Sequence, residues 1–214
     1  MADSDVPSGP IGIPRQGPRG DGHDQRYGHG RRPAPGGGAP RDGGSAPDMT
    51  ELFLLRAAGP VDLEAALALH RRCTPATLAG RYHGPLDEAD DYLPHLLDPR
   101  HGRALAARTV SGRLVGLGHL LWDGAEAEVA LLVEDAWQRR GVGSSLLSAL
   151  VEMASREQRE EVYAVCRPAD PGMAAVMRAV GLSVERHPEE DALVLSARLT
   201  ALPTAAASPA RARG

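Results

Sequence analysis

Hydrophobic and polar positions divide the chain into a patterned middle and two polar ends. Between residues 51 and 199, short apolar runs alternate with segments in which apolar residues recur every three or four positions. The first pattern indicates β-strands and the second indicates amphipathic helices. Residues 1–50 are rich in glycine and proline and carry few large apolar side chains, so we expect them to be disordered. Residues 200–214 are rich in alanine, proline and arginine, and we expect a flexible C-terminal tail there.

The middle of the chain predicts one mixed α/β domain over residues 51–199. Its first part should hold a strand at 52–57 and helices at 61–72, from Thr74-Pro75 towards Tyr82, and at 87–97. Three strands follow at 103–110, 114–122 and 125–133. The turns between these strands are short, so they should form an antiparallel meander.

The second half predicts a parallel crossover followed by a hairpin. A helix should begin at Val142, and a strand at 162–166 should lie parallel to the third meander strand. A helix at 172–180 and a hairpin of 182–185 with 192–195 complete the order. The fold class is therefore α/β with a mixed sheet, in which an antiparallel meander precedes a β-α-β crossover and a C-terminal hairpin.

The segment Gln-Arg-Arg-Gly-Val-Gly at 138–143 joins the third meander strand to the following helix. Glycines at 141 and 143 allow main-chain N–H groups to point into one concavity without obstruction by a Cβ atom. The positive end of the next helix is directed at the same place, and Arg139 and Arg140 add charge. These features predict a binding site for a diphosphate.

Other glycine motifs do not fit this chain. A dinucleotide fingerprint starting at Gly141 needs a third glycine where Leu146 stands, and one starting at Gly116 needs it where Leu121 stands. A nucleophile elbow centred on Ser145 needs glycine where Leu147 stands. All 24 basic residues are arginine, so neither a P-loop lysine nor a Schiff-base lysine exists.

With its preceding strand, this turn resembles the diphosphate motif of the GNAT (Gcn5-related) N-acetyltransferase superfamily, Gln/Arg-x-x-Gly-x-Gly/Ala. Gln138, Gly141 and Gly143 match the motif in place. The resemblance spans residues 51–199 and includes the segment from Asp170 to Gly181. It implies a GNAT fold with acetyl-CoA as co-substrate and without a metal ion.

The resemblance also implies which residues bind the co-substrate. Main-chain groups of Leu131, Leu132 and Val133 should pair with the pantetheine arm. Main-chain N–H groups should hold the diphosphate, and another N–H near the end of strand 125–133 should polarise the acetyl carbonyl. The implied binding residues outside that strand are Gln138, Arg139, Arg140, Gly141, Val142, Gly143, Ser144 and Asp170.

An ammonium group must lose a proton before it attacks a thioester, so a carboxylate is needed at the acetyl end. Glu126 and Glu128 lie two apart on the expected strand and share one face. Ala-Glu-Val-Ala at 127–130 is similar to a segment of the bacterial protein-lysine acetyltransferase branch whose glutamate is the base, which favours Glu128. Glu134 and Asp135 are expected at the loop surface.

The general acid of many family members is missing from this sequence. Met177 stands where those members carry a tyrosine, and Tyr163 is expected in a core or sheet-face role. Cys166 is expected to be a small buried apolar residue. The leaving thiolate has a pKa of about 8.5 and therefore needs no strong acid.

The acceptor is less constrained than the co-substrate. The segment from Arg71 to Gly84 is similar to a Ser/Thr-x-x-x-x-Arg-Tyr/Phe region of the same protein-lysine branch, which favours a protein lysine. A small amine remains an alternative acceptor. A catalytically silent acyl-CoA-sensing module, or a protein that binds a partner through residues 1–50, remains an alternative function.

The composition limits which partners and which cellular compartment are expected. The formal net charge of −4 gives no basic field for nucleic acid, and no run of about 18 apolar residues suits a membrane span. The two cysteines fit a reducing compartment, and the histidines lack metal-ligand spacing. We expect a cytoplasmic enzyme, either a monomer or a homodimer.

Overall fold

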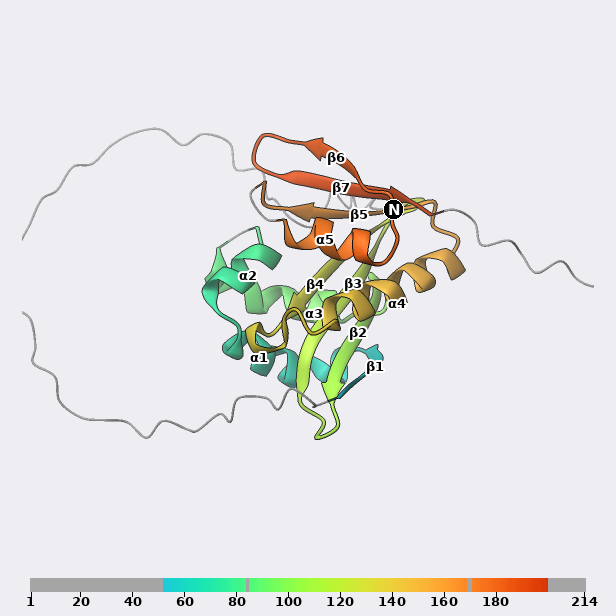
Figure 1. Cartoon of the computed structure of the whole chain (residues 1–214). Coiled ribbons are helices and arrows are strands. Elements are labelled where there is room, and N and C mark those ends of the chain that lie inside the picture. The colour runs from blue at the N-terminus through green and yellow to red at the C-terminus, as the bar shows by residue number, and fades with distance from the viewer. Residues whose placement is uncertain (1–51, 84, 169–170, 200–214) are drawn as a thin grey trace, which may run out of the picture.

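The computed structural model describes residues 52–83, 85–168 and 171–199 of the chain (Figure 1). The predictions for residues 1–50, for residues 200–214 and for Asp170 therefore lie outside the described residues. The described segments form one α/β domain built on a seven-stranded sheet with the order β1-β2-β3-β4-β5-β7-β6. The strands are β1 (Phe53–Ala58), β2 (Gly102–Thr109), β3 (Leu114–Asp123), β4 (Glu126–Val133), β5 (Glu161–Cys166), β6 (Glu185–Pro188) and β7 (Leu193–Arg198).

Helices cover both faces of this sheet. The α-helices are α1 (Leu63–Arg72), α2 (Pro75–Arg81), α3 (Leu93–Leu96), α4 (Val142–Arg156) and α5 (Gly172–Ala179). Three 3₁₀ helices join them: η1 (Pro60–Asp62), η2 (Leu86–Tyr92) and η3 (Asp135–Trp137). In Figure 1, α1, α2 and α3 lie on one side of the sheet, and α4 and α5 lie on the other.

Two apolar layers hold the helices to the sheet. On one face, Leu146, Leu147 and Leu150 of α4 are fully buried and pack against β2–β5. On the other face, Leu69 of α1 and Leu93 of α3 pack against β2 and β3. Each fully buried leucine contributes on the order of 2 kcal/mol to folding. β4 is buried between both layers, which is why its sequence is nearly continuous in apolar residues.

The meander and the crossover are confirmed. β2, β3 and β4 pair antiparallel in chain order, and β4 pairs parallel with β5 after the crossover through α4. α4 begins at Val142, the residue expected from the pattern. These elements have strong local signals, since each combines an apolar period with a glycine turn.

Two predicted elements differ from the structure. The helix expected at 87–97 is a 3₁₀ helix followed by one turn of α-helix, and Pro94 lies in the first turn of α3. Proline cannot donate the N–H bond of a helix interior, so a continuous helix is broken there. The first hairpin strand is at Glu185–Pro188 rather than 182–185. Leu182 and Val184 precede β6 and pack on the core. The residues of β6 itself are all exposed, so the hydrophobic pattern predicted the strand three residues too early.

In the part of the chain that the structure describes, no helix is long and apolar enough to cross a membrane.

Candidate active site

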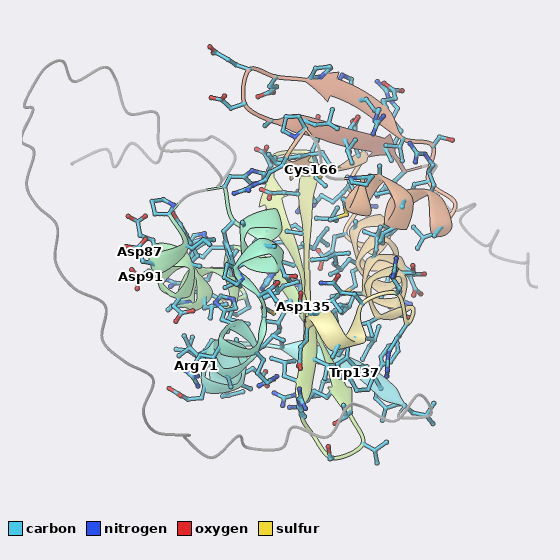
Figure 2. All side chains as sticks on the ribbon, turned by 60° about the vertical axis from the view of Figure 1, so that its left-hand side comes forward. Arg71, Asp87, Asp91, Asp135, Trp137 and Cys166 are labelled. Carbon is cyan, nitrogen blue, oxygen red and sulfur yellow. The ribbon has the colours of Figure 1, made fainter. Side chains whose placement is uncertain are left out.

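The central feature of the site is a gap that opens between two parallel strands. β4 and β5 are paired only at Glu126–Glu161, Ala127–Val162 and Glu128–Tyr163. Beyond Glu128 the strands diverge, and β4 from Val129 to Val133 lines a cavity of about 700 Å³ together with the end of β5. Cys166 and Asp135, labelled in Figure 2, are both part of its lining and lie well apart in that view.

The turn that leads into α4 lies along this cavity. Gly141 is the N-cap of α4 with φ 84°, and no side chain caps the helix. Arg139 also has a left-handed φ of 56°, which is uncommon for a residue with a Cβ atom. The first helical bond runs from Ser145 N to Gly141 O at 2.9 Å. The N–H groups of Val142–Ser144 precede that bond and are the donors that a helix N-terminus offers to an anion.

The two glycines of this turn differ in what a side chain would meet. A Cβ atom built on Gly143 would lie 3.7 Å from Val176 and 4.0 Å from Leu131, inside the cavity lining. At Gly141 a Cβ atom would meet nothing within 4 Å, so the left-handed φ is what favours glycine there. The turn therefore fits a diphosphate, and the gap beside it fits an extended arm.

Most of the predicted binding residues surround this cavity. The expected residues that line it are Leu131, Leu132, Val133, Gln138, Arg139, Gly141, Gly143 and Ser144. Two others do not line it: the Val142 side chain is buried in the core, and the Arg140 guanidinium lies 5.3 Å from the centre of the Trp137 ring. Gln138 donates from Nε2 to Thr77 Oγ1 and to Val133 O, both at 3.1 Å, so its amide bridges α2 and the end of β4.

Glu128 lies at the point where the gap begins. Glu128 is only 7% exposed, whereas Glu126 on the same strand is exposed. Burial raises the pKa of the Glu128 carboxyl, the positive charge of Arg81 lowers it in part, and the charge of Asp123 raises it further. Glu128 is not itself part of the cavity lining, so a proton would reach it through an intervening group or a water molecule.

The other side chains near Glu128 that could transfer a proton are not available to the site. The Tyr163 hydroxyl donates a hydrogen bond to Asp123 Oδ2 at 2.8 Å. Burial and then this hydrogen bond raise the pKa of Tyr163 above its usual value, so the phenol stays protonated. Met177 is fully buried, and the residues by which α5 lines the cavity are Gly172, Met173, Ala175 and Val176. The described part of α5 therefore presents no titratable side chain to the site.

The sequence-based prediction for the loop after β4 is wrong for Glu134. This carboxylate is 5% exposed and accepts hydrogen bonds from Arg72 Nε at 3.0 Å and from Arg113. Asp135 is exposed as expected but accepts bonds from Thr74 N at 2.8 Å and from Thr77 Oγ1 at 2.7 Å. Both carboxylates fix the α1–α2 region against the end of β4. In the sequence, only Thr74-Pro75 indicated a structural feature here, the start of α2.

Arg81 also lines the cavity. The resemblance to the protein-lysine branch includes this arginine, but it was not among the predicted binding residues. Among the described residues, no group of three or more His, Cys, Asp or Glu side chains is arranged to hold a metal ion.

Comparisons with known proteins agree with this geometry. Residues 53–183, more than half of the chain, match the family model described as an acetyltransferase (GNAT) domain. No curated protein matches the chain at a significant level.

Solved structures share the fold at low sequence identity. The GNAT domain of S. lividans PAT is 24% identical with a TM-score of 0.61, over 72% of this chain and 100% of that one. A GNAT superfamily phosphinothricin acetyltransferase from Sinorhizobium meliloti, solved with AcCoA, is 18% identical with a TM-score of 0.56, over 73% and 96%. Spermidine N-acetyltransferase from Vibrio cholerae, solved with CoA and spermine, is 15% identical with a TM-score of 0.54, over 68% and 95%. The chain therefore belongs to the GNAT family and is an N-acetyltransferase.

Proposed function

We propose that this enzyme moves the acetyl group of acetyl-CoA directly to a primary amine in a ternary complex, with Glu128 as general base. The observation that carries the proposal is the end of the β4–β5 ladder at Glu128. The anion-binding turn lies along the cavity that extends from this point. A co-substrate bound by the turn at its diphosphate would therefore direct its far end towards the buried carboxylate.

The residues of the turn and of β4 would hold the co-substrate. Main-chain N–H groups from Arg139 to Ser144 suit the diphosphate, and the Arg139 side chain adds charge at the cavity. Leu131, Leu132 and Val133 line the cavity on the edge of β4 that no longer pairs with β5. Their main-chain groups could therefore form strand-like hydrogen bonds with the amide groups of the pantetheine arm. Bound acetyl-CoA supplies an acetyl thioester as the electrophile.

Glu128 would receive the proton that the acceptor ammonium must lose. A base acts best when its pKa lies near the working pH, and burial moves the Glu128 pKa in that direction. A main-chain N–H group beyond Glu128, where β4 no longer pairs with β5, would stabilise negative charge on the acetyl oxygen. The thiolate needs no strong acid, which agrees with the cavity-lining residues of α5, none of which is titratable.

The acceptor class has two candidates. The sequence resemblance of residues 71–84 favours a protein lysine, and that remains a prediction. The second candidate is a small amine that enters the cavity. Solved proteins of this fold are named for phosphinothricin and for spermidine, so the fold serves small acceptors of opposite charge. Acetyl-CoA use, a cytoplasmic location and a monomeric or homodimeric state also remain predictions.

Calorimetry with acetyl-CoA, followed by a thiol-release assay over a panel of amines and lysine peptides, tests the proposal. We expect saturable binding of acetyl-CoA and CoA release that depends on an added amine. Binding without thiol release for every acceptor would instead support the acyl-CoA-sensing alternative. Failure to bind acetyl-CoA would remove the assignment of the turn.

A further inference from the structure

Two carboxylates on the same face of β4 differ in their exposure. Glu126 and Glu128 are two residues apart on one strand, so their side chains leave the sheet on the same side. Glu126 is exposed, whereas Glu128 is buried. The strand itself treats both residues alike, so the difference comes from side chains that neighbouring elements place over it. In the sheet, β4 lies between β3 and β5 (Figure 1).

The Tyr163 side chain crosses β4 at this point. Tyr163 on β5 is in register with Glu128, and its hydroxyl donates a hydrogen bond to Asp123 Oδ2 at 2.8 Å. Asp123 is the last residue of β3 and is in register with Glu126. Registered residues of neighbouring strands point to the same face of a sheet. The phenol therefore starts level with Glu128, ends level with Glu126, and passes over β4 between the two carboxylates.

The hydrogen bond also fixes where the Asp123 charge lies relative to Glu128. Neighbouring strands are about 4.8 Å apart, so β3 and β5 are about 10 Å apart, a distance that a tyrosine and an aspartate side chain span together. Asp123 and Glu128 are diagonal neighbours across the β3–β4 pair, and such residues are about 7 to 8 Å apart. A charge at this distance acts on a buried carboxylate, because burial reduces the screening by water.

Several charged or titratable groups share this face of the sheet. Burial raises the pKa of Glu128 most, the charge of Arg81 lowers it, and the charge of Asp123 raises it. Burial also lowers the pKa of both nearby histidines, so they carry no charge at neutral pH. The groups are Asp123 and His119 on β3, Glu126 on β4, Tyr163 and Glu161 on β5, and Arg81 and His83 at the end of α2.

The side-chain bond is not needed to hold these strands together. Main-chain pairing between β3 and β4 extends to Asp123 and Glu126, and pairing between β4 and β5 runs from Glu126 to Glu128. The three strands are therefore already joined at this level by backbone hydrogen bonds. What the bond adds is a fixed side chain between Glu128 and the exposed end of β4.

We propose that Asp123 and Tyr163 are positioning residues, which shield Glu128 from water and hold a negative charge beside it so that it is a stronger base. This inference rests on the proposed function, in which Glu128 is the general base. The Tyr163 ring provides the shield, and its hydroxyl holds the Asp123 carboxylate in place. The proton of the acceptor ammonium goes to the Glu128 carboxylate, while the Tyr163 proton stays on the phenol in its bond to Asp123.

Asp123→Asn tests the charge. The amide oxygen of asparagine can still accept the Tyr163 hydrogen bond, so the substitution removes the charge and keeps the shape. In the thiol-release assay, the acidic inflection of kcat/KM should move to lower pH by roughly 0.5 to 1 unit. Plateau kcat should fall about two- to fivefold, because the base is weaker, and the Kd of acetyl-CoA should not change. Asp123→Glu keeps the charge and should keep the inflection close to that of the unmodified protein.

Glu126→Gln is the matched control. It also removes a negative charge from this face, at a separation of about 7 Å along β4, but the Glu126 side chain is exposed. Its inflection should stay close to that of the unmodified protein. All variants use the same acceptor, so the ionisation of the acceptor cancels in the comparison. Equal shifts in Glu126→Gln and Asp123→Asn, or an unchanged inflection in Asp123→Asn, overturn the proposal.

Tyr163→Phe tests the bond. Loss of the hydroxyl releases the Asp123 carboxylate towards water, so the inflection should move in the same direction as in Asp123→Asn. The double variant should shift no further than Asp123→Asn alone, because both changes remove one interaction. Additive shifts would show that the two residues act separately and overturn the proposal. Normal turnover in Glu128→Gln would reject the base itself, whereas an inactive Glu128→Gln beside an unshifted Asp123→Asn rejects only this inference.

Discussion

Glu128 and Tyr163 form the last registered pair between β4 and β5, and both residues are buried but differ in their hydrogen bonding. The Tyr163 hydroxyl is bound to Asp123, whereas the buried Glu128 carboxylate has no hydrogen bond among the described residues. A carboxylate in this state is poorly solvated and more basic than usual. The junction thus combines a strand geometry that opens the cavity with a carboxylate suited to accept a proton.

Glu128→Gln should retain acetyl-CoA binding and lose about 10²- to 10⁴-fold in kcat, as expected for removal of a general base. The ionised form is the active one, so kcat/KM of the unmodified enzyme should fall as pH decreases through an inflection above the ordinary glutamate pKa of 4.5. That acidic limb should be absent in the variant. Calorimetry and pH-rate profiles measure both effects.

Glu126→Gln is the matched control, because Glu126 is exposed on the same strand two residues away. Stability provides a second control. Burial raises the Glu128 pKa in the folded state, so the ionised carboxyl destabilises the native state at pH above its unfolded pKa. Glu128→Gln should therefore unfold at the same or a higher urea concentration at pH 7. Normal turnover in Glu128→Gln would reject Glu128 as the base.

Gly141→Glu should abolish acetyl-CoA binding, because it places a carboxylate at the anion-binding turn. Gly112→Glu is a matched control for backbone strain. Both glycines have a left-handed φ, 84° and 87°, and neither has a heavy atom within 4 Å of a built Cβ. Each substitution should cost about 1 kcal/mol or more of folding free energy. Only Gly141→Glu should also remove calorimetric binding, and equal Kd values for the two variants would contradict the assignment of the turn.

The sequence predicted those parts of the site that depend on neighbours in the chain. The turn at Gly141 and Gly143, the start of α4 and the crossover to β5 each follow from local periods and glycines. Residues whose role arises from distant contacts were missed. Glu134 gains its burial from Arg72, 62 residues earlier, and no local pattern encodes that contact.

Arg81 illustrates the same limit for function. In the sequence it is one of several arginines near a helix end, and the resemblance alone marked its segment. Its place in the cavity lining depends on α2 lying beside β4, which is far away in the sequence. Such a contact is a property of the folded molecule, so hydrophobic periodicity does not predict it.

Glu134→Gln should reduce the free energy of unfolding by about 2 kcal/mol, because it weakens charged hydrogen bonds at a buried position. The Arg72 guanidinium keeps its bond to Ala68 O at 2.8 Å, so the fold should survive. Asp98→Asn is the control, since its partner Arg100 is 82% exposed and such a pair contributes little. Urea denaturation measures both variants, and equal midpoints for them would show that the Glu134 cluster is not stabilising.

Asp135→Ala should loosen α2 from the end of β4. The carboxylate accepts bonds from Thr74 N, Thr74 Oγ1 and Thr77 Oγ1, at 2.7 to 2.8 Å, and these bonds join the start of α2 to η3 together with the bond from Gln138 to Thr77. Because α2 lines the cavity through Thr77 and Gly80, its release should raise KM for the acceptor more than Kd for acetyl-CoA. Hydrogen exchange over residues 74–82 should accelerate, and Asp87→Ala, at an exposed site (Figure 2), should leave that exchange unchanged.

The hydrogen bonds between Asp135 and the start of α2 should weaken at acidic pH. Burial alone would raise the Asp135 pKa, but the hydrogen bonds from Thr74 and Thr77 outweigh it and hold the pKa below the ordinary 3.8. A carboxyl group whose pKa is lowered by folding stabilises the native state above its unfolded pKa, and that stabilisation is lost as pH falls through the folded value. Protection factors over residues 74–82 should thus hold at pH 5 to 7 and decline below about pH 4 in the unmodified protein. In Asp135→Ala they should be low throughout and lack this step, and an identical decline in both proteins would assign the acid response to another carboxylate.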